Sequence, residues 1–472
     1  MLKYIHRNAG REPALDITFG DFIMSKGSKK TSRREFLQGA AGAVTAFTIV
    51  PRHVLGQGMT PPSEKLNIAG IGAGGMGGGD IDAVAGAGGN IVALCDVDLR
   101  RASAIQKYPD AKVYRDFRKM FDEMEDKIDA VIVGTPDHTH AVAAMAAIKR
   151  GKHVYCEKPL AHSVSEVRAL IKAARDYKVV TQLGNQGHSF NTIRTFCEWI
   201  WDGAIGNVHT IQCGCAAVNS GIRHLNRMDQ KEEIPPELDW DLWLGPAQER
   251  PYHSFYLPGR WRGWVPFGNG TIGDWICHVV DPVFWALDLG APTTIHAQVK
   301  DWDPHTQGDA YPMGDIITFE FPAKAGRGPI KLVWHSGTEK IPRAKELEPG
   351  RKPVETGAYV YGDKGVIMYG SHGAGGVRII PEKAMKAYTQ PEKKIPRVKE
   401  HHDDWLRAIR EGRKAGSDFS YGGPLTELAM LGVIAMKIPN TKLQWDSENT
   451  RFTNSDEANQ HINPPYRKGW TL

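Results

Sequence analysis

Three ionisable side chains in this 472-residue chain have the types and spacing needed to deprotonate a secondary alcohol. Lys158 lies in the turn Glu157-Lys158-Pro159, directly after the predicted strand 153–156, where an ammonium stabilises an alkoxide and relays a proton if its pKa is depressed. Asp274 and His278 stand at positions i and i+4 of a predicted helix, so their side chains share one face. Because imidazole titrates near neutral pH, His278 is the expected general base. Asp274 is expected either to orient His278 or to hold the neighbouring hydroxyl.

A glycine-rich loop after the first predicted strand indicates a dinucleotide site. The apolar run 66–71 predicts a buried parallel strand. The loop that follows has the G-x-G-x-x-G spacing and consists of Gly72, Ala73, Gly74, Gly75, Met76 and Gly77. Such glycines allow a tight turn, close approach of a pyrophosphate and close packing of helix on strand. The next predicted strand ends in Asp96, whose carboxylate suits ribose hydroxyls and would repel a 2'-phosphate. The sequence therefore favours NAD over NADP.

The region 59–183 is predicted to be a Rossmann dinucleotide-binding domain, because strands and helices alternate along it. The predicted strand 130–133 ends at the sheet edge where open α/β folds bind ligands. The residues expected to cap the following helix or line the cofactor there are Thr135, Pro136, His138 and His140, with Glu157 and Lys158 from the next strand end. Two histidines without a third ligand make an incomplete metal site, so no metal is expected.

The region 184–472 is predicted to be the substrate and oligomerisation domain. It opens with Asn185, Gln186 and His188, which are expected to line a polar pocket. Farther on, Trp261 and Arg262 belong to a Pro/Gly-punctuated aromatic loop that also contains Tyr252, His253, Tyr256 and Trp264. Aromatic faces beside an arginine suit a polyhydroxylated ring, although half of these aromatics are expected to be core.

Taken alone, the Glu157-Lys158-Pro159 segment also fits a surface lysine in an X-Pro turn. The pair Asp274 and His278 also fits an ordinary polar helix face. Together, the glycine loop, Asp96, Thr135-Pro136 and Glu157-Lys158-Pro159 resemble the glucose-fructose oxidoreductase / inositol dehydrogenase / rhizopine catabolism (Gfo/Idh/MocA) family, over nearly everything after residue 64. The resemblance implies a C-terminal α/β domain with a large open mixed sheet, whose face often forms dimers or tetramers. It also implies catalytic roles for Lys158, Asp274 and His278.

The N-terminal segment 1–58 is expected to be an export signal and linker. Residues 29–37, with Arg33 and Arg34, run into an apolar stretch at 39–50, and this resembles a twin-arginine signal. The stretch is shorter than the roughly 20 residues that span a bilayer, so no stable membrane anchor is expected. An amphipathic helix is the alternative. The resemblance implies the twin-arginine translocase as a transient partner and a periplasmic or otherwise extracytoplasmic location.

The charge argues against a nucleic-acid-binding protein, and the cysteine spacing argues against a cysteine-bound metal site. The net charge is +5, but nine of the 59 Lys and Arg and only four of the 54 Asp and Glu precede residue 59, so the remainder is balanced. A neutral body offers no field that gathers phosphate backbone, so nucleic-acid binding is not expected. The six cysteines lack metal-site spacing, and Cys213 and Cys215 would point the same way on a strand. They are predicted to be mostly buried thiols.

The sequence thus favours an exported, NAD-dependent oxidoreductase acting on a sugar or sugar derivative. Because the periplasm holds no exchangeable NAD pool, the cofactor would be loaded before export and recycled by a second substrate. One alternative is an NAD-dependent glycosidase that oxidises its substrate transiently and eliminates the aglycone. Another is a non-catalytic, NAD-holding sugar-binding protein, which retention of Lys158, Asp274 and His278 disfavours.

Overall fold

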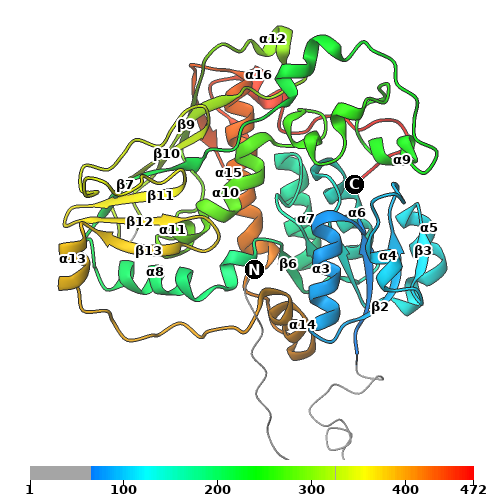
Figure 1. Ribbon diagram of the computed structural model, residues 1–472, viewed down its shortest axis with the longest axis horizontal. Coiled ribbons are helices and arrows are strands. Elements are labelled where there is room, and N and C mark those ends of the chain that lie inside the picture. The colour runs from blue at the N-terminus through cyan, green and yellow to red at the C-terminus, as the bar shows by residue number, and fades with distance from the viewer. Residues whose placement is uncertain (1–64, 325) are drawn as a thin grey trace, which may run out of the picture. The chain divides into compact units, whose positions relative to one another are not determined.

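The computed structural model describes residues 65–324 and 326–472 (Figure 1). The predicted export signal lies outside the described residues. Among the described residues, no helix is both long and apolar enough to cross a membrane. All six cysteines are buried and unpaired, as their spacing predicted.

The first part of the described chain is a six-stranded parallel sheet in the order β3-β2-β1-β4-β5-β6, which is the Rossmann order. Its strands are β1 (Asn67–Ile71), β2 (Asn90–Cys95), β3 (Lys112–Tyr114), β4 (Ala130–Val133), β5 (His153–Cys156) and β6 (Thr181–Leu183). Its helices are α3 (Gly75–Gly86), α4 (Ala104–Lys107), α5 (Phe117–Met124), α6 (Asp137–Ile148) and α7 (Val164–Asp176). Strand β6, the last of this sheet, ends at Leu183, and the domain boundary at that residue stays a prediction.

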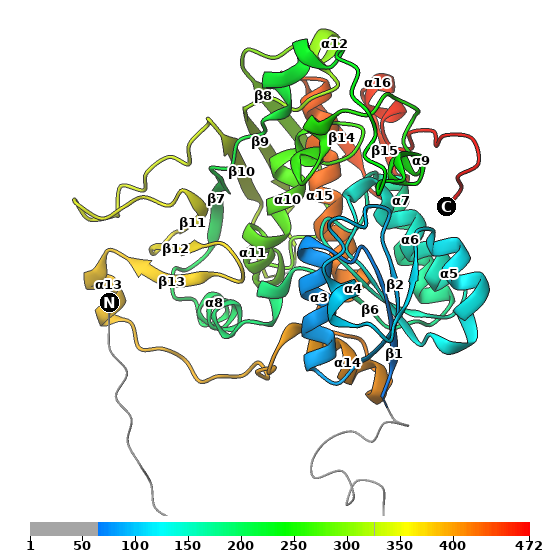
Figure 2. The ribbon, with the colours of Figure 1, turned by 45° about the vertical axis from the view of Figure 1, so that its right-hand side comes forward.

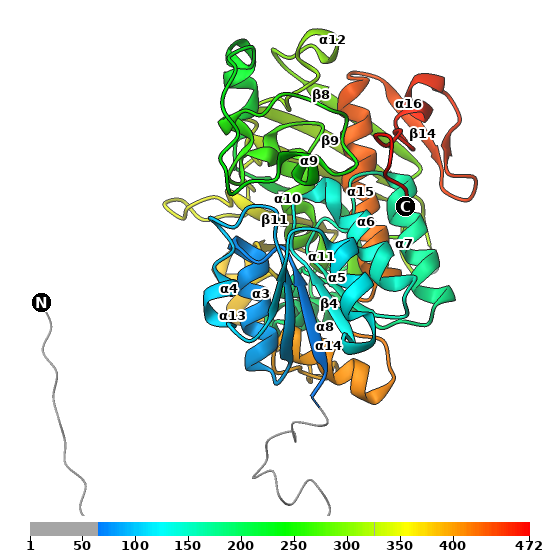
Figure 3. The same cartoon turned by 90° about the vertical axis from the view of Figure 1, so that its right-hand side faces the viewer.

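Both faces of this sheet are covered by helices. Successive side chains of a strand point to opposite faces, so they enter different cores. Ile68 and Ile132 pack on the side of α3, whereas Ala69 and Val131 pack on the side of α6 and α7. Figure 3 shows α3 and α4 on one side of the sheet and α6 and α7 on the other. Trp405 of α14 (His401–Glu411) joins the core on the α3 side, so a late segment of the chain completes the first domain.

The second domain is built on a nine-stranded sheet in the order β13-β12-β11-β7-β10-β9-β8-β14-β15. Its strands are β7 (Val208–Cys215), β8 (Thr294–Val299), β9 (Gly314–Phe321), β10 (Ile330–Gly337), β11 (Thr356–Gly362), β12 (Val366–Gly370), β13 (Gly375–Ile380), β14 (Lys442–Asp446) and β15 (Arg451–Phe452). The β7–β10 pair is parallel and the other pairs are antiparallel, so the sheet is mixed. The fold class predicted from the sequence is confirmed.

Helices α10 and α15 pack between the two sheets. The remaining helices are α8 (Asn191–Trp201), α9 (Trp240–Leu244), α10 (Gly270–Val279), α11 (Asp281–Ala286), α12 (Pro304–Gln307), α13 (Glu382–Ala387), α15 (Phe419–Lys437) and α16 (Asp456–Gln460). Figure 2 shows α10 and α15 between the nine-stranded sheet and the Rossmann domain, and α15 packs against both α7 and β8. The predicted helix bearing Asp274 and His278 is α10, which therefore lies where the two domains meet.

Candidate active site

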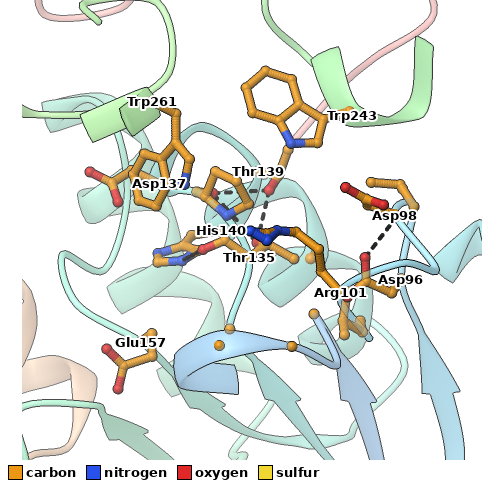
Figure 4. Close-up of a pocket in the computed structure, with 18 of the residues that line it drawn as sticks. Asp96, Asp98, Arg101, Thr135, Asp137, Thr139, His140, Glu157, Trp243 and Trp261 are labelled. Carbon is orange, nitrogen blue, oxygen red and sulfur yellow. Dashed lines mark hydrogen bonds between the residues drawn. The ribbon is translucent and has the colours of Figure 1, made fainter. Parts of the chain in front are cut away.

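A cleft of about 440 Å³ opens at the carboxyl ends of the parallel strands. Its walls come from the glycine loop, the ends of β2, β4 and β5, and the aromatic loop of the second domain (Figure 4). Thr135, Pro136, Glu157 and Lys158 all line it, and their contact with a cofactor stays a prediction. The location of the cleft at this edge of the sheet was also predicted, because parallel strands present all their carboxyl ends on one side.

The glycine loop has the close packing that a dinucleotide site requires. A Cβ atom on Gly74 would lie 2.0 Å from the carbonyl oxygen of Arg101, and one on Gly77 would lie 2.3 Å from that of Gly72. Gly72 itself has a φ of +88°, which favours glycine. Helix α3 starts at Gly75 without a side-chain cap, and Gly74, Gly75 and Met76 line the cleft, so the first N–H groups of the helix are available to an anion there. The residues present therefore fit a bound pyrophosphate.

Asp96 lies beside this loop and also stabilises it. Its carboxylate accepts the N–H of Ala73 at 2.8 Å and the N–H of Asp98 at 2.9 Å. Burial raises the pKa of Asp96. Figure 4 shows Asp96, Asp98 and Arg101 at one end of the cleft. Asp96 is thus placed for the predicted ribose contact, and it also fixes the loop through its bonds to the backbone.

The two histidines of α6 have different roles, and only His140 lines the cleft as predicted. His138 does not line the cleft, because its ring is buried against Trp243 and Phe267 and contacts a carbonyl oxygen of each. His140 lines the cleft, but its nitrogens lie 2.8 Å from the carbonyl oxygen of Pro159 and 2.7 Å from that of Thr135. Burial lowers the pKa of His138 to about 3 and that of His140 to about 4. His138 is a core residue, and His140 ties the loops after β4 and β5 together.

Lys158 forms an ion pair with the carboxylate of α10. Its Nζ lies 2.6 Å from Oδ1 of Asp274, and Nε of Arg262 lies 3.1 Å from the same oxygen. Burial alone would lower the pKa of Lys158, but Asp274 and Glu157 raise it. Burial would raise the pKa of Asp274, yet Lys158 and Arg262 lower it to about 2. The condition for proton relay, a depressed pKa of Lys158, is therefore not met, and the side chain is held as an ammonium.

Asp274 does not orient His278. No hydrogen bond joins the two within the described residues, and Nδ1 of His278 is buried without a partner there. The imidazole of His278 instead stacks on that of His372, with ring centroids 4.1 Å apart. Burial and the charge of Lys158 lower the pKa of His278 well below 6.5. His278 is consequently neutral and able to accept a proton, and its neighbour His372 carried no signal in the sequence.

The polar segment after β6 is mostly structural. Asn185 and His188 do not line the cleft: both are buried and bond the carboxylate of Asp281, at 3.1 and 3.0 Å. Their expected pocket-lining role is not what the structure places them to do. Gln186 does not line the cleft either: it donates to Glu157 Oε1 at 2.9 Å and so acts on the turn that carries Lys158.

A buried polar network continues from that turn toward the surface. Nε2 of Gln186 lies 3.4 Å from Oδ1 of Asp80, which in turn lies 3.0 Å from Nε2 of His402. Burial would lower the pKa of His402, but Asp80 and Glu400 raise it to about 9. Burial and the charge of Asp80 raise the pKa of Glu157 to about 8. His402 is therefore held as a histidinium, and its positive charge offsets those of Asp80 and Glu400 in the network behind Lys158.

The aromatic loop divides between the cleft and the core. Trp261 lines the cleft, and the guanidinium of Arg262 lies 4.2 Å from its ring centroid. The other predicted members, Tyr252, His253, Tyr256 and Trp264, are buried, and the three aromatic rings of Tyr252, Tyr256 and Trp264 share one core cluster. Trp243 also lines the cleft (Figure 4), although nothing in the sequence singled it out. Two cations, Lys158 and Arg262, thus adjoin Asp274, and the ring of Trp261 lies against Arg262.

Asp137, the first residue of α6, bonds to the segment that precedes α10. Its Oδ2 accepts both the backbone N–H and the side-chain amide of Asn269, each at 3.1 Å. Burial raises the pKa of Asp137 to about 7. Asn269 precedes α10, so this contact fixes the start of the helix that carries Asp274 and His278.

Two models of one protein family match most of the described chain. Residues 66–185 match the oxidoreductase family's NAD-binding Rossmann fold, and residues 219–322 and 347–472 match its C-terminal alpha/beta domain. The chain therefore belongs to the Gfo/Idh/MocA oxidoreductase family. This confirms the resemblance found in the sequence and the NAD-binding character of the first domain.

Individual relatives agree with this assignment. An inositol 2-dehydrogenase of Rubrobacter xylanophilus is 36% identical over 117 residues, which are 24% of this chain and 33% of the relative. A levoglucosan dehydrogenase of Pseudarthrobacter phenanthrenivorans is 24% identical over 234 residues, 49% of this chain and 50% of the relative. The matches thus span a third to half of these relatives. The structure of an aldose-aldose oxidoreductase from Caulobacter crescentus complexed with glycerol has a TM-score of 0.54 at 17% identity, covering 81% of this chain and 100% of that one. It shares the fold.

Proposed function

We propose that the protein is an exported, NAD-dependent oxidoreductase that oxidises a secondary alcohol of a sugar or sugar derivative. The observation that carries the proposal is the Lys158 ammonium, held by Asp274 on the wall of the dinucleotide cleft. A binding protein has no need of a buried cation at that point. The named relatives that act on inositol and levoglucosan support a polyhydroxylated substrate.

The residues divide the chemistry of the alcohol between them. The ammonium of Lys158 stabilises the oxygen as it loses its proton, since an adjacent cation favours the anionic form. Neutral His278 accepts that proton. The glycine loop and Asp96 would hold NAD, which would supply the hydride acceptor needed for oxidation of the alcohol to a carbonyl compound. Asp274 keeps Lys158 charged and positioned, and Trp261 offers an apolar face to the C–H surface of the ring.

Export and assembly belong to the same proposal and rest on the sequence. The segment 29–50 supports passage through the twin-arginine translocase to the periplasm or another extracytoplasmic site. Folded passage allows NAD to be loaded beforehand, and a second, carbonyl substrate would reoxidise the NADH formed and become an alcohol. The family resemblance supports a homo-oligomer, a dimer or a tetramer.

The first test is denaturing extraction of the purified protein to identify bound NAD or NADH, followed by a sugar and glycoside screen. Cofactor absorbance and aglycone release are recorded together. Reduction of the cofactor by a sugar supports the proposal, whereas a protein that neither contains nor binds a dinucleotide overturns it. Aglycone release without net cofactor reduction identifies the glycosidase route instead.

Lys158→Met separates catalysis from binding. Because the lysine acts mainly in the transition state, kcat should fall at least a hundredfold while sugar affinity changes much less. Lys158→Arg should rescue poorly, since the planar guanidinium needs different space. Lost affinity with unchanged turnover per bound sugar would assign Lys158 to binding only.

A further inference from the structure

The last residues of the chain end at the dinucleotide cleft. After α16, the segment 461–472 passes α7, where Ile462 accepts the N–H of Ser165 at 3.2 Å and Tyr466 donates to Glu166 at 2.5 Å. It then reaches α9 and α6, beside which Figure 1 marks the C-terminus. At its end, Lys149 donates to the carbonyl oxygen of Leu472 at 2.9 Å. The segment is thus fixed along its length.

Arg467 is the main anchor of this segment. Its side chain is buried, forms an ion pair with Asp241, and donates to the carbonyl oxygens of Asp241 and Gly245 at 2.9 and 3.0 Å. A buried guanidinium with several partners is costly to displace. Gly469 follows with a φ of +90°, and this turn places Trp470.

Trp470 lines the cleft together with Phe117 and Ala143. The centroid of its ring lies 6.2 Å from that of Phe117, and the guanidinium of Arg118 lies 4.6 Å from the Trp470 ring. Asp116 holds that guanidinium in place at 2.7 Å. An indole supported in this way is a rigid apolar surface.

This surface lies at the adenosine end of the cleft. In a Rossmann fold, the carboxylate after the second strand marks the adenosine ribose, and here that residue is Asp96. The residues around Asp96 in the cleft include Val97, Arg101 and Arg115, and Phe117 follows β3 on the same side. The nicotinamide is expected near Lys158, because that residue follows β5, on the other side of β1 from β2 and β3.

We propose that Trp470 is an adenine-binding residue and that the C-terminal segment, pinned by Arg467, closes the adenosine end of the cleft. The inference rests on the proposed use of NAD. Aromatic side chains stack on nucleobases and thereby stabilise the bound base. A stacking residue carried by an anchored tail slows cofactor release, because the base leaves only after it unstacks. Slow release is the property that an exported enzyme with a preloaded cofactor needs.

The test compares ligands that do and do not contain adenine. Trp470→Ala should weaken binding of ADP-ribose and NAD by roughly tenfold or more in calorimetry, and leave nicotinamide mononucleotide unchanged. NADH should leave the variant faster by a similar factor when displaced by excess NAD. Trp470→Phe should retain most of the affinity. Arg467→Ala, which releases the tail, should reproduce the Trp470→Ala result.

Trp201→Ala is the matched control, because Trp201 is 53% exposed and does not line the cleft. It should leave both ligand classes unchanged. Unchanged ADP-ribose affinity in Trp470→Ala, or equal losses for ADP-ribose and nicotinamide mononucleotide, would overturn the inference while the function stands. A wild-type protein that binds no NAD would overturn both.

Discussion

The Nζ atom of Lys158 lies 2.6 Å from Oδ1 of Asp274, and this pair joins the end of β5 to α10 across the two domains. Neither partner is freely solvated, since their side chains are 8% and 23% exposed. Arg262 completes the cluster by contacting the same carboxylate oxygen. Two cations therefore share one anion, and the excess positive charge is available to an oxygen of the substrate.

Asp274→Asn should destabilise the protein by about 3 kcal/mol, because removal of one partner leaves the other charge buried and unpaired. Turnover should fall as well, since Lys158 loses its position. The double variant Asp274→Asn/Lys158→Met should recover much of the stability. Urea unfolding of the wild type, both single variants and the double variant gives the coupling free energy, and a value near zero would contradict the pair's importance.

His278→Ala should lower turnover roughly a hundredfold or more while leaving bound NAD in place, because it removes the general base and not the cleft. The base must be unprotonated, so activity should fall as the pH drops through the lowered pKa of His278, below 6.5. In His372→Gln this acid limb should move upward, because the His372 charge helps to lower that pKa. A pH profile of kcat/KM checks both expectations, and wild-type turnover in His278→Ala would exclude it as the base.

Gly77→Ala should weaken NAD binding at least tenfold and lower the melting temperature, because the new Cβ would lie 2.3 Å from a carbonyl oxygen. Gly79→Ala is the matched control on the same helix, since its Cβ meets nothing within 4 Å. That variant should gain about 0.5–1 kcal/mol of stability from the better helix former. Calorimetry and thermal unfolding measure both, and equal NAD affinity in the two variants would refute the packing argument.

The pair formed by His402 and Asp80 should make stability depend on pH. The folded-state pKa of His402 is about 9, above its ordinary 6.5, so the stabilisation is complete below pH 6.5 and is lost as the pH rises through 9. The free energy of unfolding should therefore fall more between pH 6 and pH 9.5 in the wild type than in His402→Gln. His209→Gln, at an exposed histidine, should behave like the wild type. Identical pH dependence in wild type and His402→Gln would contradict the assignment.

The sequence alone predicted the features that depend on local geometry. The G-x-G-x-x-G loop, Asp96 and the Glu157-Lys158-Pro159 turn follow predicted strands directly, so their place at one edge of a parallel sheet followed from strand direction. The i and i+4 spacing of Asp274 and His278 placed both on one helix, which is α10. These relationships extend over a few residues, where backbone periodicity is sufficient.

Only the tertiary structure decided which groups those residues meet. Asp274 pairs with Lys158, 116 positions earlier in the chain, and not with the histidine one turn away. Asn185 and His188, polar residues beside the site, turn inward to Asp281, while Trp470 reaches the cleft from the other end of the chain. The physical reason is that a buried polar or charged group must find a partner, and the partners available at each point are set by long-range packing. Sequence spacing fixes where a side chain starts, and burial with its neighbours fixes its charge and its role.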